Sequence, residues 1–333
     1  MERLPARAGD PRHRPAHPHR GGDRDRALGH SDRGGDPPRA EEAVDVLLTA
    51  LTATVGRLPA PAAAWIGRRL GDLLWIALPR RRRVALDNLR HAFPAMSEPE
   101  RRRIARRSCQ HLGLVFVELC AVLARPLDAA LAGLTLEGTE HLERAVAAHG
   151  RAVLLTAHLG NWEMLSVAGR LTPWPLAVVV RPLDASWLNR LAERLRSKAG
   201  VELIDKRQAL RPVLRALSEG RLVGILLDQN ASRREGVFVP FFGRPASTSR
   251  SVAVLALRTR TPVVPIFARR EPDGRHRIAI HPPLDLPPRG SGERAVADLT
   301  ARCTAAIEAA ILESPDQWLW IHGRWRTRPP EPR

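Results

Sequence analysis

The chain contains no tyrosine, and aromatic residues make up only 4% of its 333 residues. Proteins that bind single-stranded nucleic acids stack the bases on aromatic side chains, so this shortage argues against nucleic acid as the partner. No zinc-finger spacing or RNA-recognition motif is present either. The formal net charge of +18 nevertheless predicts an acidic partner. With nucleic acid disfavoured, we expect an anionic membrane surface or an acidic protein.

Cysteine is also scarce, with three residues at Cys109, Cys120 and Cys303. They have neither a CxxC spacing nor the even number that a disulfide framework requires. Their number excludes a small disulfide-stapled protein and fits a reducing compartment. A chain of this length can bury a large core without covalent cross-links.

A long uninterrupted apolar run is the third absence. Residues 43–78 are rich in Ala and Leu, but prolines and charged residues break them before the roughly 18 to 20 residues of a membrane-spanning helix are reached. Trp65 and Trp75 lie in this segment, and four arginines follow at 80–83. This combination predicts an element that lies among lipid headgroups. The alternative is an amphipathic helix packed on the core, with the arginines in solvent.

The sequence before residue 129 divides into two parts. Residues 1–41 are mainly Arg, His, Gly, Pro and Asp, and they predict a disordered basic tail because they hold too little apolar surface to bury. They also lack the apolar core of a secretory signal. Residues 42–128 predict a helical, membrane-interface region. Within it, Ser97 and Glu100 have the spacing of a capping box at a helix start.

Residues 129–333 alternate short apolar runs with helical stretches. This pattern predicts an α/β catalytic domain with a largely parallel mixed sheet covered by helices on both faces. Ligands of such sheets bind beyond the carboxyl ends of the strands. His158 and Asp228 each follow a predicted strand. The predicted strands cover 152–156, 176–180, 201–204, 222–227 and 263–267, and the predicted helices cover 161–170, 186–199, 208–219 and 248–258.

His158 and Glu163 lie within the stretch TAHLGNWE (156–163). A five-residue offset in a continuous helix would turn the two side chains apart, so they can meet only across a bend. Gly160 and Asn161 supply such a bend. A carboxylate that holds an imidazole makes it a general base for a hydroxyl. A structural histidine followed by an acidic residue near a helix N-terminus is the alternative.

Motifs for other catalytic schemes are missing. The sequence has no GxSxG elbow, no HExxH zinc motif, no Walker A loop and no GxGxxG after a strand. We therefore expect the base to act on the hydroxyl of a bound substrate and not on a nucleophile of the protein.

HLGNWE (158–163) resembles the HxxxxD/E motif of the glycerolipid acyltransferase superfamily, in the form found in its bacterial lipid A biosynthesis (lauroyl/myristoyl) acyltransferase branch. Other blocks are similar to the same family in the same order, so the resemblance covers about 43–329. They are RRRRVALDNLRHAFP (80–94), VVVRP (178–182), LLDQN (226–230), GVFVPFFGRPASTS (236–249), TPVVPIF (261–267) and DQWLWIHGRWRTRP (316–329).

The resemblance implies an O-acyltransferase that moves a fatty acyl chain from acyl carrier protein, or an acyl-CoA, to a hydroxyl of an anionic glycolipid such as a lipid A precursor. The enzyme would work at the cytoplasmic face of the inner membrane, without metal or organic cofactor. His158 would be the general base and Glu163 its orienting carboxylate.

The resemblance also suggests substrate contacts. Arg181 is the preferred contact for an acceptor phosphate, because a guanidinium binds phosphate oxygens in a bidentate way. Asp228, Gln229 and Asn161 are further candidates; Asp228 and Gln229 would orient acceptor hydroxyls or Arg181, or cap a turn. Arg181 could also be a solvated strand-end residue.

Two departures bear on the substrate. Glu163 stands where many superfamily members carry Asp, and DQN replaces a Glu-Gly-Thr-Arg type of sequence, which together point away from phosphatidic acid synthesis. A phosphatidylinositol mannoside-type or other lysolipid acyltransferase is the nearest enzymatic alternative. A non-catalytic basic membrane-binding protein is the alternative from another class.

Overall fold

The computed structural model describes residues 37–182, 185–288 and 292–330. Glu42–Arg333 form one compact unit. The predicted disordered tail lies outside the described residues up to residue 36, and residues 37–41 begin the helix α1 (Pro37–Gly56). The predicted division near residue 128 stays a prediction.

A seven-stranded sheet forms the centre of this unit, in the order β1-β9-β8-β2-β5-β3-β4. Every neighbouring pair is parallel except β8 and β9. A separate antiparallel hairpin pairs β6 with β7. The predicted α/β class and largely parallel mixed sheet are confirmed. The strands are β1 (Leu134–Glu137), β2 (Ala152–Thr156), β3 (Leu176–Val180), β4 (Glu202–Asp205), β5 (Leu222–Leu226), β6 (Gly236–Phe241), β7 (Arg244–Ser249), β8 (Val263–Arg270) and β9 (His276–Ile280).

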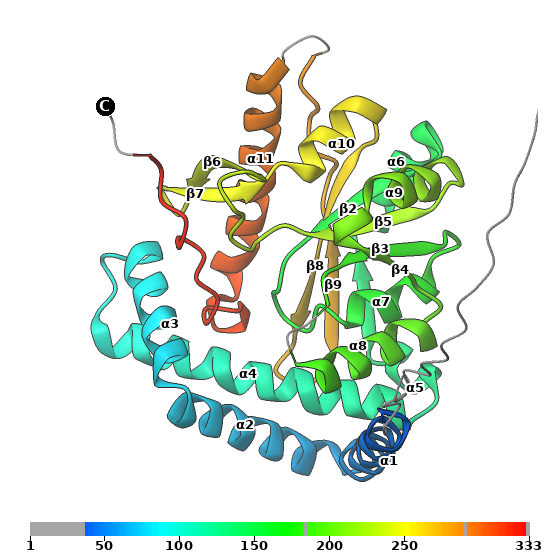
Figure 1. Cartoon of the computed structure of the whole chain (residues 1–333), viewed down its shortest axis with the longest axis vertical. Coiled ribbons are helices and arrows are strands. Elements are labelled where there is room, and N and C mark those ends of the chain that lie inside the picture. The colour runs from blue at the N-terminus through cyan, green and yellow to red at the C-terminus, as the bar shows by residue number, and fades with distance from the viewer. Residues whose placement is uncertain (1–36, 183–184, 289–291, 331–333) are drawn as a thin grey trace, which may run out of the picture. The chain divides into compact units, whose positions relative to one another are not determined.

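Strand β2 contributes to a core on each face of the sheet. Val153 and Leu155 belong to one buried cluster, whereas Ala152 and Leu154 belong to another. Because successive strand residues point to opposite faces, the two clusters lie on opposite sides of the sheet. Helices α9, α10 and α11 supply side chains to the first cluster, and α6, α7 and α8 to the second (Figure 1). These helices are α6 (Thr139–His149), α7 (Met164–Ala168), α8 (Ser186–Lys198), α9 (Leu210–Ser218), α10 (Ser251–Thr259) and α11 (Gly292–Glu313).

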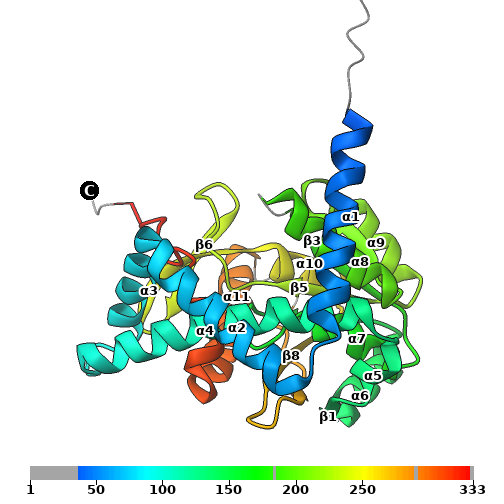
Figure 2. The ribbon, with the colours of Figure 1, turned by 90° about the horizontal axis from the view of Figure 1, so that it is seen from below.

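The helices that precede β1 include a pair that packs very closely. Helix α4 runs along one end of the sheet, and α2 lies on its outer side (Figures 1 and 2). A Cβ placed on Gly113 of α4 would lie 2.0 Å from the carbonyl oxygen of Gly67 in α2, so the two backbones can approach only because both positions lack a side chain. The helices are α2 (Ala60–Ala77), α3 (Pro79–Ala92), α4 (Glu98–Ala124) and α5 (Leu127–Leu131).

Helix α4 begins where the capping-box prediction placed its start. The backbone N–H of Ser97 donates to Glu100 Oε2 at 3.0 Å, which confirms that pairing. Among the described residues, α4 is the one helix long and apolar enough to cross a membrane. However, 56% of its apolar 18-residue stretch is buried inside the protein. That burial is typical of a core helix.

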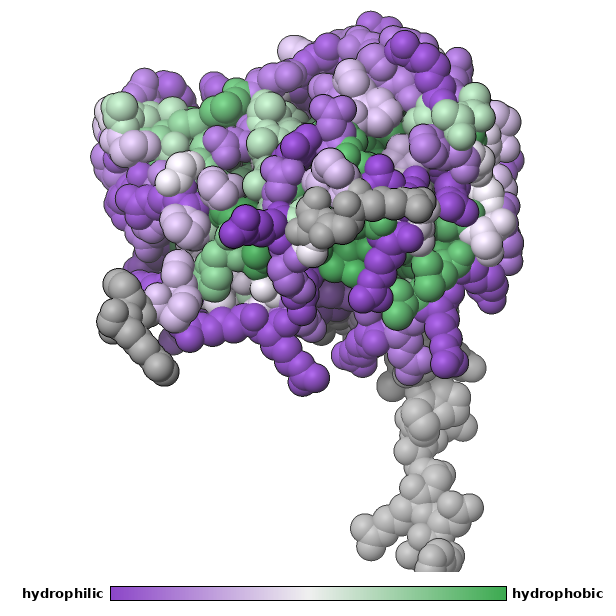
Figure 3. Space-filling model, turned by 90° about the horizontal axis from the view of Figure 1, so that it is seen from above, coloured by the Kyte–Doolittle hydropathy of each residue, from purple (hydrophilic) through white to green (hydrophobic). Residues whose placement is uncertain are grey.

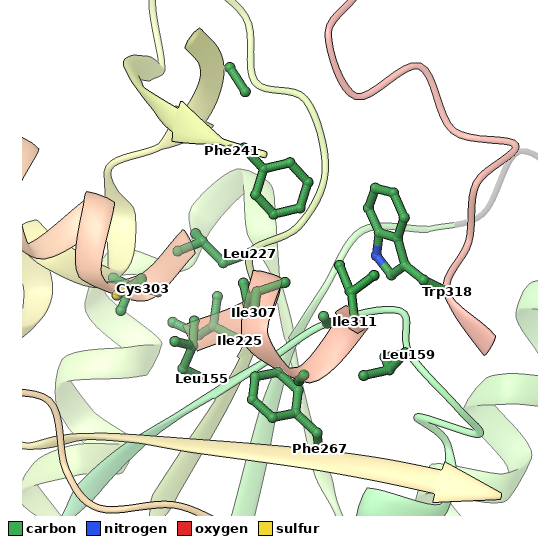
Figure 4. Packing of buried hydrophobic residues seen from close by; sticks show 14 of the residues in the cluster. Leu155, Leu159, Ile225, Leu227, Phe241, Phe267, Cys303, Ile307, Ile311 and Trp318 are labelled. Atoms are coloured by element: carbon green, nitrogen blue, oxygen red, sulfur yellow. The ribbon is translucent and has the colours of Figure 1, made fainter. Parts of the chain in front are cut away.

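The C-terminal segment packs onto the core. Trp318 and Trp320 are 1% and 0% exposed, so both pack in the core and neither lies at a membrane interface. In Figure 4 the Trp318 indole lies beside Ile311 of α11, and Phe241 of β6 points into the same cluster. The segment thereby reaches the end of β2.

Apolar side chains are unevenly exposed on the surface. On the outer helices, Trp65, Leu73 and Ile76 of α2 are each at least 60% exposed, and Val46 and Leu47 of α1 are 69% exposed. The opposite face of the molecule, shown in Figure 3, is mostly hydrophilic and has apolar areas between the polar side chains. Of the six described large apolar side chains that are at least 60% exposed, five lie on these two outer helices, and the sixth is Leu210 of α9.

Candidate active site

His158 stands on a tight bend immediately beyond β2. The bend needs Gly160, whose φ is +57° and whose Cβ would lie 2.0 Å from the carbonyl oxygen of Ala268 in β8. Only glycine accepts this conformation and this approach together. The bend therefore fixes the loop against the sheet before any side chain contributes.

The C-terminal segment holds the other side of this loop. The backbone N–H of Leu319 donates to the carbonyl of His158 at 3.2 Å, and that of Gly160 donates to the carbonyl of Gln317 at 3.1 Å. Leu159 and Trp318 form an antiparallel bridge between them. The backbone of His158 is thus held by residues about 160 positions further along the chain.

The carboxylate that binds His158 is Asp228, which follows β5. Asp228 Oδ1 lies 2.9 Å from Nδ1 of the imidazole, and Oδ2 accepts the backbone N–H of His158 at 3.0 Å. The indole Nε1–H of Trp318 also donates to Oδ2, at 2.8 Å. Strands β2 and β5 are parallel neighbours, so their carboxyl ends bring the two residues together.

Asp228 is 2% exposed. Burial raises the pKa of its carboxyl, but the charge of His158 and the hydrogen bonds from His158 and Trp318 together lower it to about 2. Asp228 is therefore ionised at neutral pH and can only accept hydrogen bonds. Nδ1 of His158 must carry a proton to meet it, so in the neutral form of the imidazole the lone pair lies on Nε2.

The second ring nitrogen of His158, Nε2, has the side chain of Gln229 as its neighbour. The side-chain amide nitrogen of Gln229 lies 3.4 Å from it, which makes this a long hydrogen bond. The His158 side chain is 20% exposed and Gln229 is exposed. A neutral imidazole with its lone pair accessible can take a proton from a hydroxyl.

Glu163 does not take the place predicted for it beside the imidazole. It precedes α7, is 5% exposed, and forms a bidentate ion pair with Arg196 of α8, with Nε–Oε2 at 3.0 Å and Nη2–Oε1 at 2.7 Å. Its Oε1 also accepts the indole N–H of Trp162 at 3.1 Å. The helix that follows the bend directs the side chain towards α8, so His158 is bound by Asp228 instead.

Asn161, a candidate substrate contact from the sequence, lies below the surface. It is 0% exposed, and its amide donates to Glu118 Oε2 of α4 at 2.8 Å. Glu118 is paired as well with Arg270 at 2.6 Å and with His276 at 3.2 Å. Burial raises the pKa of Glu118, but these two partners lower it to about 2. Asn161 therefore ties the His158 loop to α4.

Arg181 lies where the sequence placed it, directly after β3, and it is exposed. Strand β3 pairs with β5, which pairs with β2, so Arg181 and His158 are at the same edge of the sheet. Its predicted role towards a phosphate stays a prediction.

The cysteines do not contribute a nucleophile. Burial raises the pKa of Cys109 and of Cys120 to about 11 and that of Cys303 to about 12, so all three are thiols at neutral pH. Within the ranges that the structure describes, no group of three or more His, Cys, Asp and Glu side chains could hold a metal ion.

Comparison with known proteins identifies the family. The model of the bacterial lipid A biosynthesis acyltransferases matches residues 39–327. The chain belongs to this family. Its members are acyltransferases, so the chain is an acyltransferase-family enzyme, as the motifs implied.

Three individual relatives are identical to this acyltransferase at 27% to 30% of the aligned residues. It is 30% identical over 279 residues to lipid A biosynthesis lauroyltransferase of Escherichia coli, covering 83% of this chain and 89% of that protein. It is 27% identical over 277 residues to the palmitoleoyltransferase of the same organism, covering 82% and 88%. Similarity to phosphatidylinositol mannoside acyltransferase of Mycobacterium tuberculosis is 29% over 207 residues, covering 61% and 62%.

Sequence reasoning missed three parts of this site. It did not find Arg196 as the partner of Glu163, Trp318 as a donor to Asp228, or Glu118 as the acceptor for Asn161 of the His158 loop. Trp318 lies in the C-terminal block that resembles the family, which is the one signal in the sequence that could have pointed to it. Arg196 and Glu118 lie in helices whose amphipathic pattern gives no sign of such partners.

Proposed function

We propose that this enzyme transfers a fatty acyl chain from the thioester of acyl carrier protein, or of coenzyme A, to a hydroxyl of a lipid A precursor at the cytoplasmic face of the inner membrane. The observation that carries the proposal is the pairing of His158 Nδ1 with the buried carboxylate of Asp228. The pairing leaves Nε2 as a base at the edge of the sheet where ligands bind.

The proposed reaction is a direct transfer. Nε2 of His158 removes the proton of the acceptor hydroxyl while the oxygen of that hydroxyl attacks the thioester carbonyl carbon. The tetrahedral intermediate collapses, the carbon–sulfur bond breaks, and the imidazolium returns the proton to the leaving thiolate. Asp228 stabilises the imidazolium between these two steps.

Gln229 has a place in this scheme. Its amide nitrogen lies where a donor to Nε2 must lie, so it occupies roughly the position of the acceptor hydroxyl. On substrate binding the amide would be displaced, and it could then donate to the oxyanion of the intermediate. Arg181, exposed at the same edge, would bind the phosphate of the acceptor or donor.

The outer helices support action at a membrane. Trp65, Leu73 and Ile76 are exposed on α2, and α3 begins with an arginine run of which Arg80, Arg81 and Arg83 are exposed. Apolar side chains next to arginines fit a surface of anionic lipid. Arg82 instead lies over the ring of the buried Trp75, 5.5 Å from its centroid.

A phosphatidylinositol mannoside acceptor is the second candidate. It is supported by similarity to the mycobacterial relatives, although these align with a smaller part of the chain than the lipid A enzymes do. The catalytic residues would have the same roles, because both acceptors offer a hydroxyl on an anionic glycolipid.

A reconstituted assay tests the proposal. Purified enzyme is incubated with acyl carrier protein thioesters or acyl-CoA of several chain lengths, with lipid A precursor or with phosphatidylinositol mannoside, and products are read by mass spectrometry. We expect acylated lipid A precursor, and no product with His158→Ala. Product with the mannoside alone would assign the second candidate, and no product with any pair would reject the function.

A further inference from the structure

Glu163 is bound so completely by other residues that it cannot also orient His158. One oxygen accepts from Arg196 Nε, and the other accepts from both Arg196 Nη2 and the Trp162 indole. These contacts use three of the roughly four lone-pair sites that a carboxylate has. The side chain is also buried, so it has little room to turn.

The imidazole has no nitrogen left for Glu163 either. Nδ1 is bound to Asp228, and Nε2 must stay open to the acceptor hydroxyl for the ring to act as a base. A direct hydrogen bond from Glu163 would have to displace Asp228 or block Nε2. Glu163 therefore reaches the imidazole in another way.

The indole of Trp162 connects Glu163 to the imidazole of His158. Its ring packs edge-on against the ring of His158, with centroids 5.1 Å apart and planes at 66°. The same indole donates its N–H to Glu163, which Arg196 holds from α8. The three residues thus form a chain of contacts from α8 to the imidazole.

We propose that Arg196 is a positioning residue, which acts through Glu163 and Trp162 to hold the ring of His158 in the orientation that Asp228 and the acceptor require. Asp228 fixes which nitrogen carries the proton, whereas Trp162 restricts rotation of the ring. The proposal rests on the proposed function and assigns Glu163 a role different from that of the proton-holding carboxylate.

The bidentate geometry explains why an arginine is needed. Its Nε and Nη2 bind the two carboxylate oxygens in parallel, which sets the plane of the carboxylate and so the direction from which the indole can donate. A lysine would supply the charge at a single point without fixing that plane. Arg196→Lys should therefore keep the fold and lose part of the positioning.

Two measurements test the proposal on Glu163→Gln, Arg196→Gln, Arg196→Lys and Asp228→Asn. The first is the nitrogen-15 NMR signal of the Trp162 indole, assigned with Trp162→Phe, together with the protonated nitrogen of His158. The second is kcat and KM for the acceptor. Arg194→Gln is the matched control, because Arg194 precedes Arg196 by two residues in α8, and its side chain forms an exposed pair with Asp45 instead.

We expect Glu163→Gln and Arg196→Gln to shift the Trp162 indole signal and to lower kcat by roughly 10-fold to 100-fold, with KM nearly unchanged. Arg196→Lys should fall between Arg196→Gln and the wild type. The His158 proton should stay on Nδ1 in all three and move only in Asp228→Asn. The double variant Glu163→Gln with Arg196→Gln should be no worse than either single one, because the residues act as one unit.

Two results would overturn the proposal. If Glu163→Gln moved the His158 proton, Glu163 would be the direct partner; if Arg196→Gln left both the indole signal and kcat unchanged, Arg196 would have no positioning role. A failure of the wild type to transfer any acyl chain would reject the proposed function alone, since the NMR measurements need no turnover. Arg196→Lys provides a folded variant should Arg196→Gln fail to fold.

Discussion

Asp228 binds the imidazole of His158 at 2.9 Å, although 70 residues separate the two in the sequence. The same carboxylate accepts the His158 backbone N–H and the Trp318 indole N–H, so three hydrogen bonds converge on one buried charge. The proton of the imidazole is thereby fixed on Nδ1, and the reactive nitrogen is Nε2.

Replacing Asp228 with asparagine should remove most of the activity. An amide can donate to Nδ1 and so favour the wrong tautomer, and it cannot stabilise the imidazolium; in a related arrangement such a change costs on the order of 10⁴-fold in kcat. We expect a loss of at least about 100-fold in the acyl-transfer assay. Asp273→Asn, at an exposed turn, is the control; near wild-type turnover of Asp228→Asn would contradict the role.

Acid should destabilise the fold partly through His322. Burial is the largest influence on its pKa and lowers it to about 4, so the unfolded chain binds the proton first as the pH falls below about 6.5. Above about pH 6.5 the fold keeps the whole of this contribution to its free energy of unfolding. Towards pH 4 it loses the contribution, by up to about 3 kcal/mol. Urea unfolding at several pH values should show a shallower decrease for His322→Gln. An identical slope in the variant would refute the assignment.

The close packing of α2 and α4 should not tolerate a methyl group at Gly113. The added carbon would lie 2.0 Å from the Gly67 carbonyl, and backbone cannot move aside as a flexible side chain can. We expect Gly113→Ala to lower the free energy of unfolding by about 3 kcal/mol or to prevent folding. Gly133→Ala is the control, because its nearest contact would be an ordinary 3.4 Å. Equal stability of the two variants would be the contrary outcome.

The exposed side of α2 should bind lipid. Ile76 is 70% exposed, and its loss from a membrane surface should weaken vesicle binding by up to about 10-fold, from a transfer free energy of about 1.5 kcal/mol. Flotation with anionic vesicles would compare Ile76→Ser with Leu210→Ser, which removes a 61% exposed leucine from α9. Binding that both variants reduce equally would place the contact elsewhere.

The ion pair of Glu118 with Arg270 should stabilise the fold around the loop that carries His158. Burial raises the pKa of Glu118, but His276 and Arg270 lower it to about 2, so the site contains a partly buried carboxylate at neutral pH. Glu118→Gln leaves the guanidinium of Arg270 without its partner, and we expect a loss of about 3 kcal/mol in unfolding free energy. Calorimetry of Glu118→Gln and of exposed Glu140→Gln would measure the difference. Similar melting of the two would show that the pair contributes little.

Much of the fold could be predicted because its strands are short apolar runs. The predicted strand over 152–156 coincides with β2, and that over 176–180 coincides with β3. The strands β1 and β9 and the pairing of β6 with β7 were not predicted. Their alternation is weak, since β6 includes Pro240 and β7 consists largely of small and polar residues.

The candidate site was predicted less completely. The sequence placed His158 and Asp228 each at the end of a strand, but it paired His158 with Glu163 because these two lie in one short motif. Spacing along a chain shows which residues share a bend, and it does not show the direction in which a side chain leaves that bend. Arg196 redirects Glu163 from 33 residues away.

The sequence by itself determined the α/β class, the glycine at the bend and the presence of a histidine where parallel strands end, because these follow from local periodicity and backbone freedom. Only the tertiary structure decided which carboxylate meets the imidazole. That choice depends on the order of strands, which sets β5 beside β2, and on the approach of α8 to Glu163; both arise from packing between distant segments.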